Sequence, residues 1–234
     1  MEKNFLKVVL ASMITPCSFI HKDGGVLKIE KRSVPPAKKY FERKAKEMLK
    51  EAKKRILKAE SQIFQVDSRD FELNKKVDFI ITSPPYLNNV DYSKVYAFET
   101  SLIFPKEYHE FSKNTLRSHA FSSDKDNEEF DLDQIKKLLE TDRVPLQALN
   151  YLSDLKKVIK NCYKYTNKNA KIFFNVANGV YEESRLTLDN ALAFLMEEEG
   201  FEINEILVAR KIPVYLKSGN RFTTRESIVV AEKN

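Results

Sequence analysis

The segment Thr82-Ser83-Pro84-Pro85-Tyr86 combines a hydroxyl group, two rigid prolines and an aromatic ring directly after a run of apolar residues. That run, Val77–Thr82, is apolar on consecutive positions, which is typical of a buried parallel strand. Two successive prolines cannot continue a strand ladder, so the chain must turn at the carboxyl end of this strand. Ligands bind at that end in open α/β sheets. The sequence therefore predicts a ligand-binding loop at Ser83–Tyr86.

The groups in this loop suit a planar amino group attached to a ring. An exocyclic amine on cytosine or adenine is a poor nucleophile because its lone pair is delocalised into the ring. The Ser83 hydroxyl and the Pro84 carbonyl can accept its two hydrogens and favour a pyramidal nitrogen. Tyr86 can stack on the base, an interaction worth about 1–3 kcal/mol. The alternative is that Pro84 and Pro85 only form a rigid turn while Tyr86 fills the core.

Glycine and cysteine counts exclude several kinds of site. None of the five glycines belongs to a G-x-G-x-x-G, F-x-G-x-G or Walker pattern, so the chain encodes no glycine-rich nucleotide-binding loop. The two cysteines, Cys17 and Cys162, form no disulfide framework and have no neighbours that suit a zinc site. We therefore expect no metal centre.

Positive charge is concentrated near the N-terminus. Residues 28–58 contain thirteen Lys or Arg and four Glu, a local balance of +9, although the whole chain carries only +6. Within them, Phe41, Ala45, Met48 and Ile56 recur at helical spacing after Pro35-Pro36, which predicts a helix over about 36–60. Its basic residues form either an ordinary solvated face or a surface that contacts the phosphates of a polyanion.

The rest of the chain reads as alternating strands and helices, which predicts an α/β fold. Residues 4–15 form a short apolar helix, followed by a loop, and residues 105–145 are irregular. We expect strands at Gln62–Val66, Val77–Thr82, Lys171–Val176, Phe201–Pro213 and Ser227–Ala231, and helices over 146–164 and 186–198, the latter ending at Gly200.

These elements predict two domains. Residues 1–60 form a helical, basic segment, and residues 61–234 form the α/β part with an irregular insertion at about 105–145. No stretch reaches the roughly 18 apolar residues of a membrane span, and the N-terminus lacks the features of a signal peptide. The sequence therefore predicts a cytoplasmic protein without a membrane partner.

Residues 66–70 together with residues 77–88 resemble the amino-methylating DNA methyltransferases, which transfer a methyl group from S-adenosylmethionine to cytosine N4 or adenine N6. The resemblance covers roughly residues 60–234 and continues through residues 89–92, 116–119, 174–178 and 225–228. It implies that S-adenosylmethionine is the cofactor and DNA the partner. It also implies that Ser83, Pro84, Pro85 and Tyr86 are catalytic, and serine in the first place favours cytosine N4.

The resemblance implies further site residues. Asp67 matches the acidic residue that ends the third strand of the family beside the cofactor adenine, and Ser68 is expected next to it. Asp67 can equally cap a local turn. The substrate-binding candidates, on loops that could close over a flipped base or touch DNA, are Asn88, Asp91, Tyr92 and Arg117. Turn formation explains Asn88 and Asp91 equally well.

The family fold is a seven-stranded sheet ordered 3-2-1-4-5-7-6 with strand 7 antiparallel. This chain supplies only strands 3-4-5-7-6, a partial class I (Rossmann-like) sheet preceded by N-terminal helices. It lacks strands 1 and 2 and the glycine-rich cofactor turn, which would leave a bare apolar edge on strand 4. The chain is then either an inactive relic or one half of a split enzyme. We favour a second polypeptide that carries the glycine-rich motif and the first two strands.

The resulting hypothesis is a site-specific DNA methyltransferase half that acts on an exocyclic amine of a base flipped out of the duplex. Cytosine N4 is favoured over adenine N6 as the target. One alternative is a methyltransferase acting on exocyclic amines of RNA. Another is a non-catalytic DNA-binding subunit that uses the basic helix.

Overall fold

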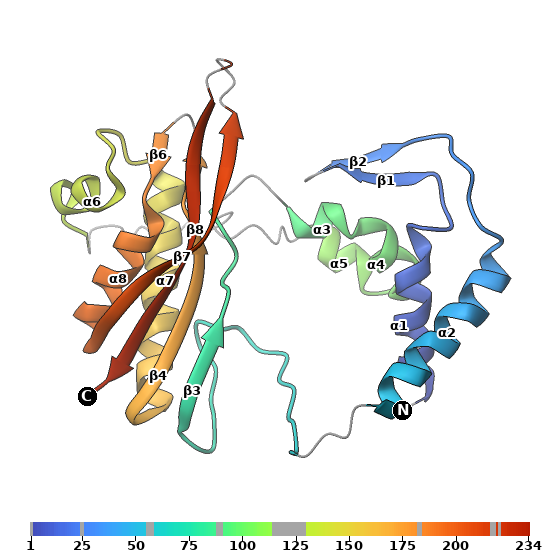
Figure 1. Ribbon diagram of the computed structural model, residues 1–234, viewed down its shortest axis with the longest axis horizontal. Coiled ribbons are helices and arrows are strands. Elements are labelled where there is room, and N and C mark those ends of the chain that lie inside the picture. The colour runs from blue at the N-terminus through green and yellow to red at the C-terminus, as the bar shows by residue number, and fades with distance from the viewer. Residues whose placement is uncertain are drawn as a thin grey trace. The chain divides into compact units, whose positions relative to one another are not determined.

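The computed structural model describes residues 2–23, 26–54, 59–87, 91–113, 130–181, 184–215, 219 and 221–234 (Figure 1). The chain divides into two compact units, Met1–Phe64 with Asn89–Leu116 and Gln65–Asn88 with Arg117–Asn234. Residues 91–113 were predicted to belong to the second domain, but they belong to the first unit. Each unit is described by itself below.

The first unit is mainly helical. It contains α1 (Glu2–Ile14), β1 (Ile20–Asp23), β2 (Val26–Ile29), α2 (Ala37–Lys54), α3 (Tyr92–Val95), α4 (Ala97–Ile103) and α5 (Tyr108–Lys113). The basic helix expected over about 36–60 is α2, which packs against α1 and has no buried residue among those described. An antiparallel hairpin, β1–β2, stands where a loop was expected. The Gly-Gly pair between two β-prone runs is a hairpin signal that the sequence analysis missed.

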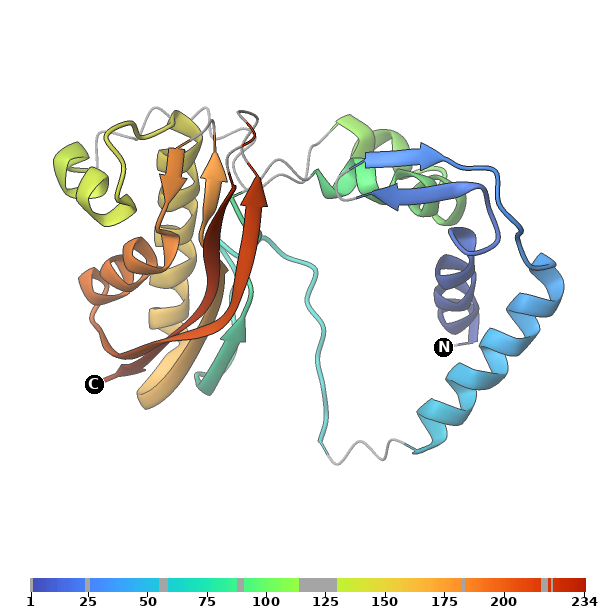
Figure 2. The ribbon, with the colours of Figure 1, turned by 45° about the horizontal axis from the view of Figure 1, so that its top comes forward.

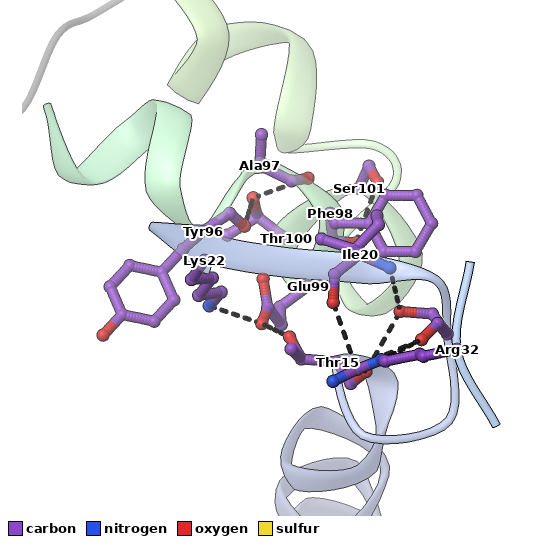
Figure 3. Close-up of polar contacts among 11 residues, drawn as sticks. Thr15, Ile20, Lys22, Arg32, Tyr96, Ala97, Phe98, Glu99, Thr100 and Ser101 are labelled. Carbon is purple, nitrogen blue, oxygen red and sulfur yellow. Dashed lines mark hydrogen bonds and ion pairs between the residues drawn. The ribbon is translucent and has the colours of Figure 1, made fainter. Parts of the chain in front are cut away.

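Polar contacts join distant segments of the first unit (Figure 3). The Arg32 guanidinium donates to the carbonyl oxygens of Thr15 at 2.7 Å and Ile20 at 3.1 Å. Glu99, on α4, accepts a hydrogen bond from the Thr15 hydroxyl at 2.8 Å and pairs with Lys22 at 2.6 Å. These contacts hold the end of α1, the hairpin and α4 together.

The second unit is built on a mixed sheet, which confirms the predicted α/β class. Its strands are β3 (Val77–Thr82), β4 (Thr166–Ala177), β7 (Phe201–Tyr215) and β8 (Arg221–Lys233), in the order β3-β4-β8-β7. β3 runs parallel to β4, and β8 is antiparallel to both β4 and β7. The predicted strand Gln62–Val66 is wrong: these residues are exposed and outside any strand. A strand needs a neighbour for its hydrogen bonds, and no described residue supplies one here.

Helices cover one face of this sheet (Figures 1 and 2). They are α6 (Leu132–Leu139), α7 (Leu146–Tyr165) and α8 (Leu188–Glu198), accompanied by a small hairpin of β5 (Gly179–Tyr181) and β6 (Ser184–Leu186). The core is formed by fully buried side chains that include Leu152, Ile159, Ile172, Phe174, Leu192 and Val229. The predicted helices over 146–164 and 186–198 are thereby confirmed.

Helices α8 and α6 show where local sequence signals predict the structure and where they do not. Gly200 follows α8 with φ +98°, and a Cβ there would lie 3.1 Å from the Tyr163 hydroxyl oxygen, so glycine suits both the conformation and the space. In contrast, α6 occupies part of the stretch 105–145 that was predicted to be irregular. Asp131 caps α6, and burial of Ile135 and Leu139 stabilises it, so tertiary packing outweighs the polar composition.

Candidate functional site

The loop Ser83–Tyr86 leaves the sheet at the carboxyl end of β3, as predicted. Thr82 is paired with Phe174 of β4, so the loop begins beside the next β4 residue, Asn175. The Tyr86 hydroxyl donates a hydrogen bond to the Glu226 carboxylate. The Asn175 amide donates to the Tyr86 oxygen at 2.9 Å and to Glu226 Oε1 at 3.1 Å. Residues from the loop, β4 and β8 thus meet at one edge of the sheet.

Glu226 is the anionic centre of this cluster, which we call the Tyr86 network: Ser83, Tyr86, Asn175, Arg210 and Glu226. Only 8% of Glu226 is exposed, and its second carboxylate oxygen accepts from the Arg210 guanidinium. The hydrogen bond from Tyr86, with those from Asn175 and Arg210, outweighs burial and lowers the pKa of Glu226. Burial and the hydrogen bond to Glu226 raise the pKa of Tyr86. The proton therefore stays on Tyr86 and the charge on Glu226.

The groups predicted to receive an amine differ in their accessibility. Ser83 and Pro85 are exposed, whereas Pro84 and Tyr86 are half-buried. The Ser83 Oγ lies 3.5 Å from the Tyr86 hydroxyl oxygen, to which it donates a long hydrogen bond. The Asn175 carbonyl oxygen is buried and has no hydrogen-bond partner among the described residues. The loop thus offers an open hydroxyl beside an aromatic ring whose hydroxyl is anchored.

A second polar cluster lies around Asp189, the second residue of α8. We call it the Asp189 network. The fully buried carboxylate of Asp189 accepts from Asn178 Nδ2 at 2.8 Å, Arg225 Nε at 2.7 Å and Ser227 Oγ at 2.6 Å. Burial opposes its ionisation, but the donors, Arg225 foremost, outweigh burial and lower the pKa of Asp189. This network joins α8 to the ends of β4 and β8.

The two networks separate two neighbouring residues of β8, Arg225 and Glu226. Adjacent strand residues point to opposite faces, so Arg225 pairs with Asp189, and Glu226 pairs with Arg210. The sequence analysis also missed Asn175 and Asp189 as network members. A carboxylate inside the apolar run Leu188–Leu195 was the available signal for Asp189.

Asp67 and Ser68, the cofactor candidates, are exposed. The Asp67 carboxylate accepts from the backbone N–H of Arg69 at 2.9 Å and pairs with its guanidinium at 2.7 Å. Arg69 also reaches Asp154 at 3.0 Å. The hydrogen bonds from Arg69 lower the pKa of Asp67. This is the turn-capping geometry of the alternative interpretation, and the cofactor role remains a prediction.

The substrate-binding candidates fall into two groups. Asn88 and Arg117 lie outside the described residues. Asp91 and Tyr92 belong to the first unit, where Asp91 is buried and caps α3 by accepting from the Ser93 backbone N–H at 3.1 Å and its hydroxyl at 2.6 Å. Tyr92 is exposed. Asp91 therefore has a turn-forming role, and a role in substrate binding remains a prediction for all four residues.

Comparison with known proteins gives matches of low identity. No family model matches the chain. It is 26% identical over 157 residues to the Type II methyltransferase M.AvaI of Nostoc sp. (strain PCC 7120) and equally to that of Anabaena variabilis, covering 56% of this chain and 32% of each relative. The chain is weakly homologous to a DNA methyltransferase. It spans about a third of the length of these curated relatives.

Solved structures give only distant similarities. A candidate DNA modification methylase from Thermus thermophilus aligns with a TM-score of 0.37 and 15% identity, covering 72% of this chain and 52% of that one. A SAM-dependent methyltransferase from Methanosarcina mazei aligns with a TM-score of 0.23 and 13% identity, covering 35% of this chain and 52% of that one.

The described part of the chain holds neither a metal-binding cluster nor a membrane-spanning helix. No three His, Cys, Asp or Glu residues there lie close enough together to hold a metal ion. None of the described helices is both long and apolar enough to cross a bilayer.

Proposed function

We propose that this chain is the catalytic half of a site-specific DNA methyltransferase that methylates an exocyclic amine of a flipped base, cytosine N4 in preference to adenine N6. The observation that carries the proposal is the Ser83–Tyr86 loop, with an exposed hydroxyl at the carboxyl end of β3 and an aromatic ring anchored by Glu226. The homology to M.AvaI supports the reaction class.

Each group in the loop has a defined task. The Ser83 hydroxyl and the Pro84 carbonyl accept the two amine hydrogens, which raises the electron density on nitrogen. Tyr86 stacks on the base, and the contacts of its hydroxyl with Glu226 and Asn175 limit the orientations of the ring. Such pre-organisation lowers the entropy cost of binding the base. The bound cofactor, S-adenosylmethionine, supplies the electrophilic methyl group.

The residues of this chain do not form a complete site for that cofactor. The chain encodes no glycine-rich turn, and the Asp67 carboxylate is engaged by Arg69. We therefore propose a second polypeptide that carries the glycine-rich motif and two further strands. Among the described strands β3 ends the sheet, and its side chains Phe79 and Ile81 are 56% and 79% exposed. Apolar side chains on an unpaired edge suit the addition of a strand.

The site is tested with Ser83→Ala and Tyr86→Ala, with Ser33→Ala as an exposed serine control. The proposal expects both site variants to lose methyl transfer to DNA while DNA binding persists, and the control to behave as wild type. Unchanged methylation in the site variants would contradict the proposed site. Methylation of RNA in place of DNA would support the RNA alternative.

The partner is tested by calorimetric titration of S-adenosylmethionine. The chain alone is expected to bind the cofactor weakly, and co-expression with a polypeptide carrying the glycine-rich motif is expected to restore tight binding. Tight binding by the chain alone refutes the need for a partner.

A non-catalytic DNA-binding subunit is the second candidate function. It is favoured by α2, where eight Lys or Arg stand against three Glu and none of the described residues is buried. In that case the Ser83 and Tyr86 variants change no reaction, and substitutions of the α2 lysines abolish DNA binding.

A further inference from the structure

A pocket of about 540 Å³ lies in the second unit, apart from the Tyr86 network. Residues 178 and 179, which follow β4, line it together with β6 and the β7–β8 pair. Its basic side chains are Arg185, Lys211 and Arg225, and Glu140 is its acidic side chain among the described residues. Positive charge therefore predominates in its walls.

The three basic residues of the pocket are not equivalent. Arg225 is neutralised by the buried Asp189. Neither Arg185 nor Lys211 forms an ion pair with a carboxylate in the described part of the chain, and both are exposed. The Arg185 guanidinium lies over the Phe222 ring, 4.4 Å from its centroid. Stacking holds the guanidinium plane while its N–H groups remain free to point at oxygen acceptors.

The strands around the pocket have a one-sided charge. From Leu207 to Arg225 the sequence contains five Lys or Arg and no Asp or Glu. Two of the five, Arg210 and Arg225, pair with the carboxylates of Glu226 and Asp189 outside the segment. Basic groups without a carboxylate partner among the described residues, here Arg185 and Lys211, attract a polyanion by releasing the counterions of its phosphates.

The pocket shares strands with the Tyr86 network but opens on the opposite face of the sheet. Lys211 follows Arg210 in β7 and Arg225 precedes Glu226 in β8, and adjacent strand residues point to opposite faces. Along β4 the two sites are close, because Asn178 of the pocket stands three residues after Asn175 of the network. Three residues of extended chain span about 10 Å. A single nucleic-acid strand is long enough to reach both places.

We propose that this pocket, through Arg185 and Lys211, binds phosphate groups of a nucleic-acid backbone that passes the end of the sheet where the Ser83–Tyr86 loop leaves β3; the pocket residue Gly179 adjoins Leu87, which follows that loop. The inference deepens the proposed function, on which its choice of ligand rests. Contacts with phosphates hold the position of a nucleic acid without reading its sequence. The pocket therefore orients the strand, whereas the loop receives the base.

The test is binding of a fluorescently labelled DNA duplex to the full chain, measured by anisotropy over a series of salt concentrations without S-adenosylmethionine. The double variant Arg185→Ala/Lys211→Ala is expected to bind about 10–100-fold more weakly at moderate salt. The slope of log affinity against log salt should fall by about 0.9 for each phosphate that is no longer bound, about 1.8 in all. The charge-conserving variant Arg185→Lys/Lys211→Arg should keep the wild-type slope.

A matched control removes two charges elsewhere in the same unit. Lys168 and Lys171 are exposed at the amino-terminal part of β4, and Lys168→Ala/Lys171→Ala should leave the slope nearly unchanged. Equal losses of affinity in both double-alanine variants would overturn the proposal, because only total charge would then matter. Thermal melting of each variant verifies that it is folded.

Free phosphate is the competing source of the same chemistry. The proposal is overturned if two results occur together. Inorganic phosphate binds saturably to the wild type but not to Arg185→Ala/Lys211→Ala, and that double variant binds the duplex as tightly as the wild type. The outcome is separable from the proposed function, because Ser83→Ala tests methyl transfer and leaves the binding slope intact. If Ser83→Ala loses methylation while Arg185→Ala/Lys211→Ala keeps the wild-type slope, the pocket proposal fails. If the slope falls while Ser83→Ala keeps methylation, the proposed function fails.

Discussion

Arg225 and Glu226 are neighbours in β8, yet they belong to different polar networks on opposite faces of the sheet. In the Asp189 network the carboxylate is completely buried, and it accepts from the side chains of Asn178, Arg225 and Ser227. In the Tyr86 network the Arg210 side chain is 67% exposed and Ser83 opens to solvent. Asn175 also keeps a buried carbonyl oxygen without a partner among the described residues. We infer that the closed network stabilises the fold and that the open one serves a ligand.

The largest expected difference between the networks is in stability. Asp189→Ala leaves Arg225, Asn178 and Ser227 without their acceptor and should lower the free energy of unfolding by about 3 kcal/mol, since removing one partner of a buried ion pair costs about 3–5 kcal/mol. Glu226→Ala should cost about 1 kcal/mol, because the exposed Arg210 regains water. Urea denaturation of both variants measures the difference. Equal losses of stability would show that the contrast between the networks is not energetic.

Glu226→Gln tests whether the open network controls Tyr86. Burial and the hydrogen bond to Glu226 raise the pKa of Tyr86, so removal of the negative charge should lower that pKa toward its ordinary value of 10.0. Ultraviolet titration of tyrosinate, with Tyr86→Phe as the reference that lacks this phenol, isolates the change. In the active complex we expect about a 10-fold fall in kcat with little change in KM for DNA, about 1.4 kcal/mol at the transition state. An unaltered tyrosine titration would show that Glu226 does not control the pKa of Tyr86.

The pH dependence of the free energy of unfolding tests the role of Asp189. The pKa of Asp189 is lowered in the folded protein, so its ionised form stabilises the fold above its ordinary value of 3.8. This contribution is lost as pH falls through the folded pKa. The stability gap between wild type and Asp189→Asn should therefore narrow at low pH, by about 1.4 kcal/mol per unit of pKa lowering. A stability difference between wild type and Asp189→Asn that stays constant from pH 7 to pH 2 would contradict this role.

The smallest effect is expected for the exposed partner of the open network. Arg210→Ala should change the free energy of unfolding by less than about 1 kcal/mol, as exposed ion pairs do. Arg225→Ala should cost more, because it leaves the buried Asp189 carboxylate with one donor fewer. Thermal melting of the two variants in parallel makes the comparison. If Arg210→Ala lost more stability than Arg225→Ala, the Tyr86 network and not the Asp189 network would be the one that stabilises the fold.

The sequence predicted the elements that carry strong local signals. α7 and α8 follow from apolar residues at helical spacing, and β3 with the turn after it follows from an apolar run ending in two prolines. The strand at Gln62–Val66 failed because its apolar residues have no neighbouring strand, and Ile63 is 97% exposed. α6 was missed because its stability comes from packing against α8.

The residues of the candidate site also fall into those that the sequence could identify and those that it could not. The residues of the Ser83–Tyr86 loop could be named from the sequence because their chemistry is contiguous. Asn175, Arg210 and Glu226 could not be assigned to Tyr86, because they come from three different strands. Asp67 could be placed at a turn, and its engagement by Arg69 fits that local role.

The turn after β3 and the absence of a glycine-rich loop follow from local residue types, because proline and glycine act on the backbone at their own positions. The cation that pairs with each carboxylate depends on how the strands align. Strand register brings Arg210 opposite Glu226, and the alternation of side chains turns Arg225 away toward Asp189. Those pairings depend on contacts between residues far apart in the chain, which no local pattern encodes.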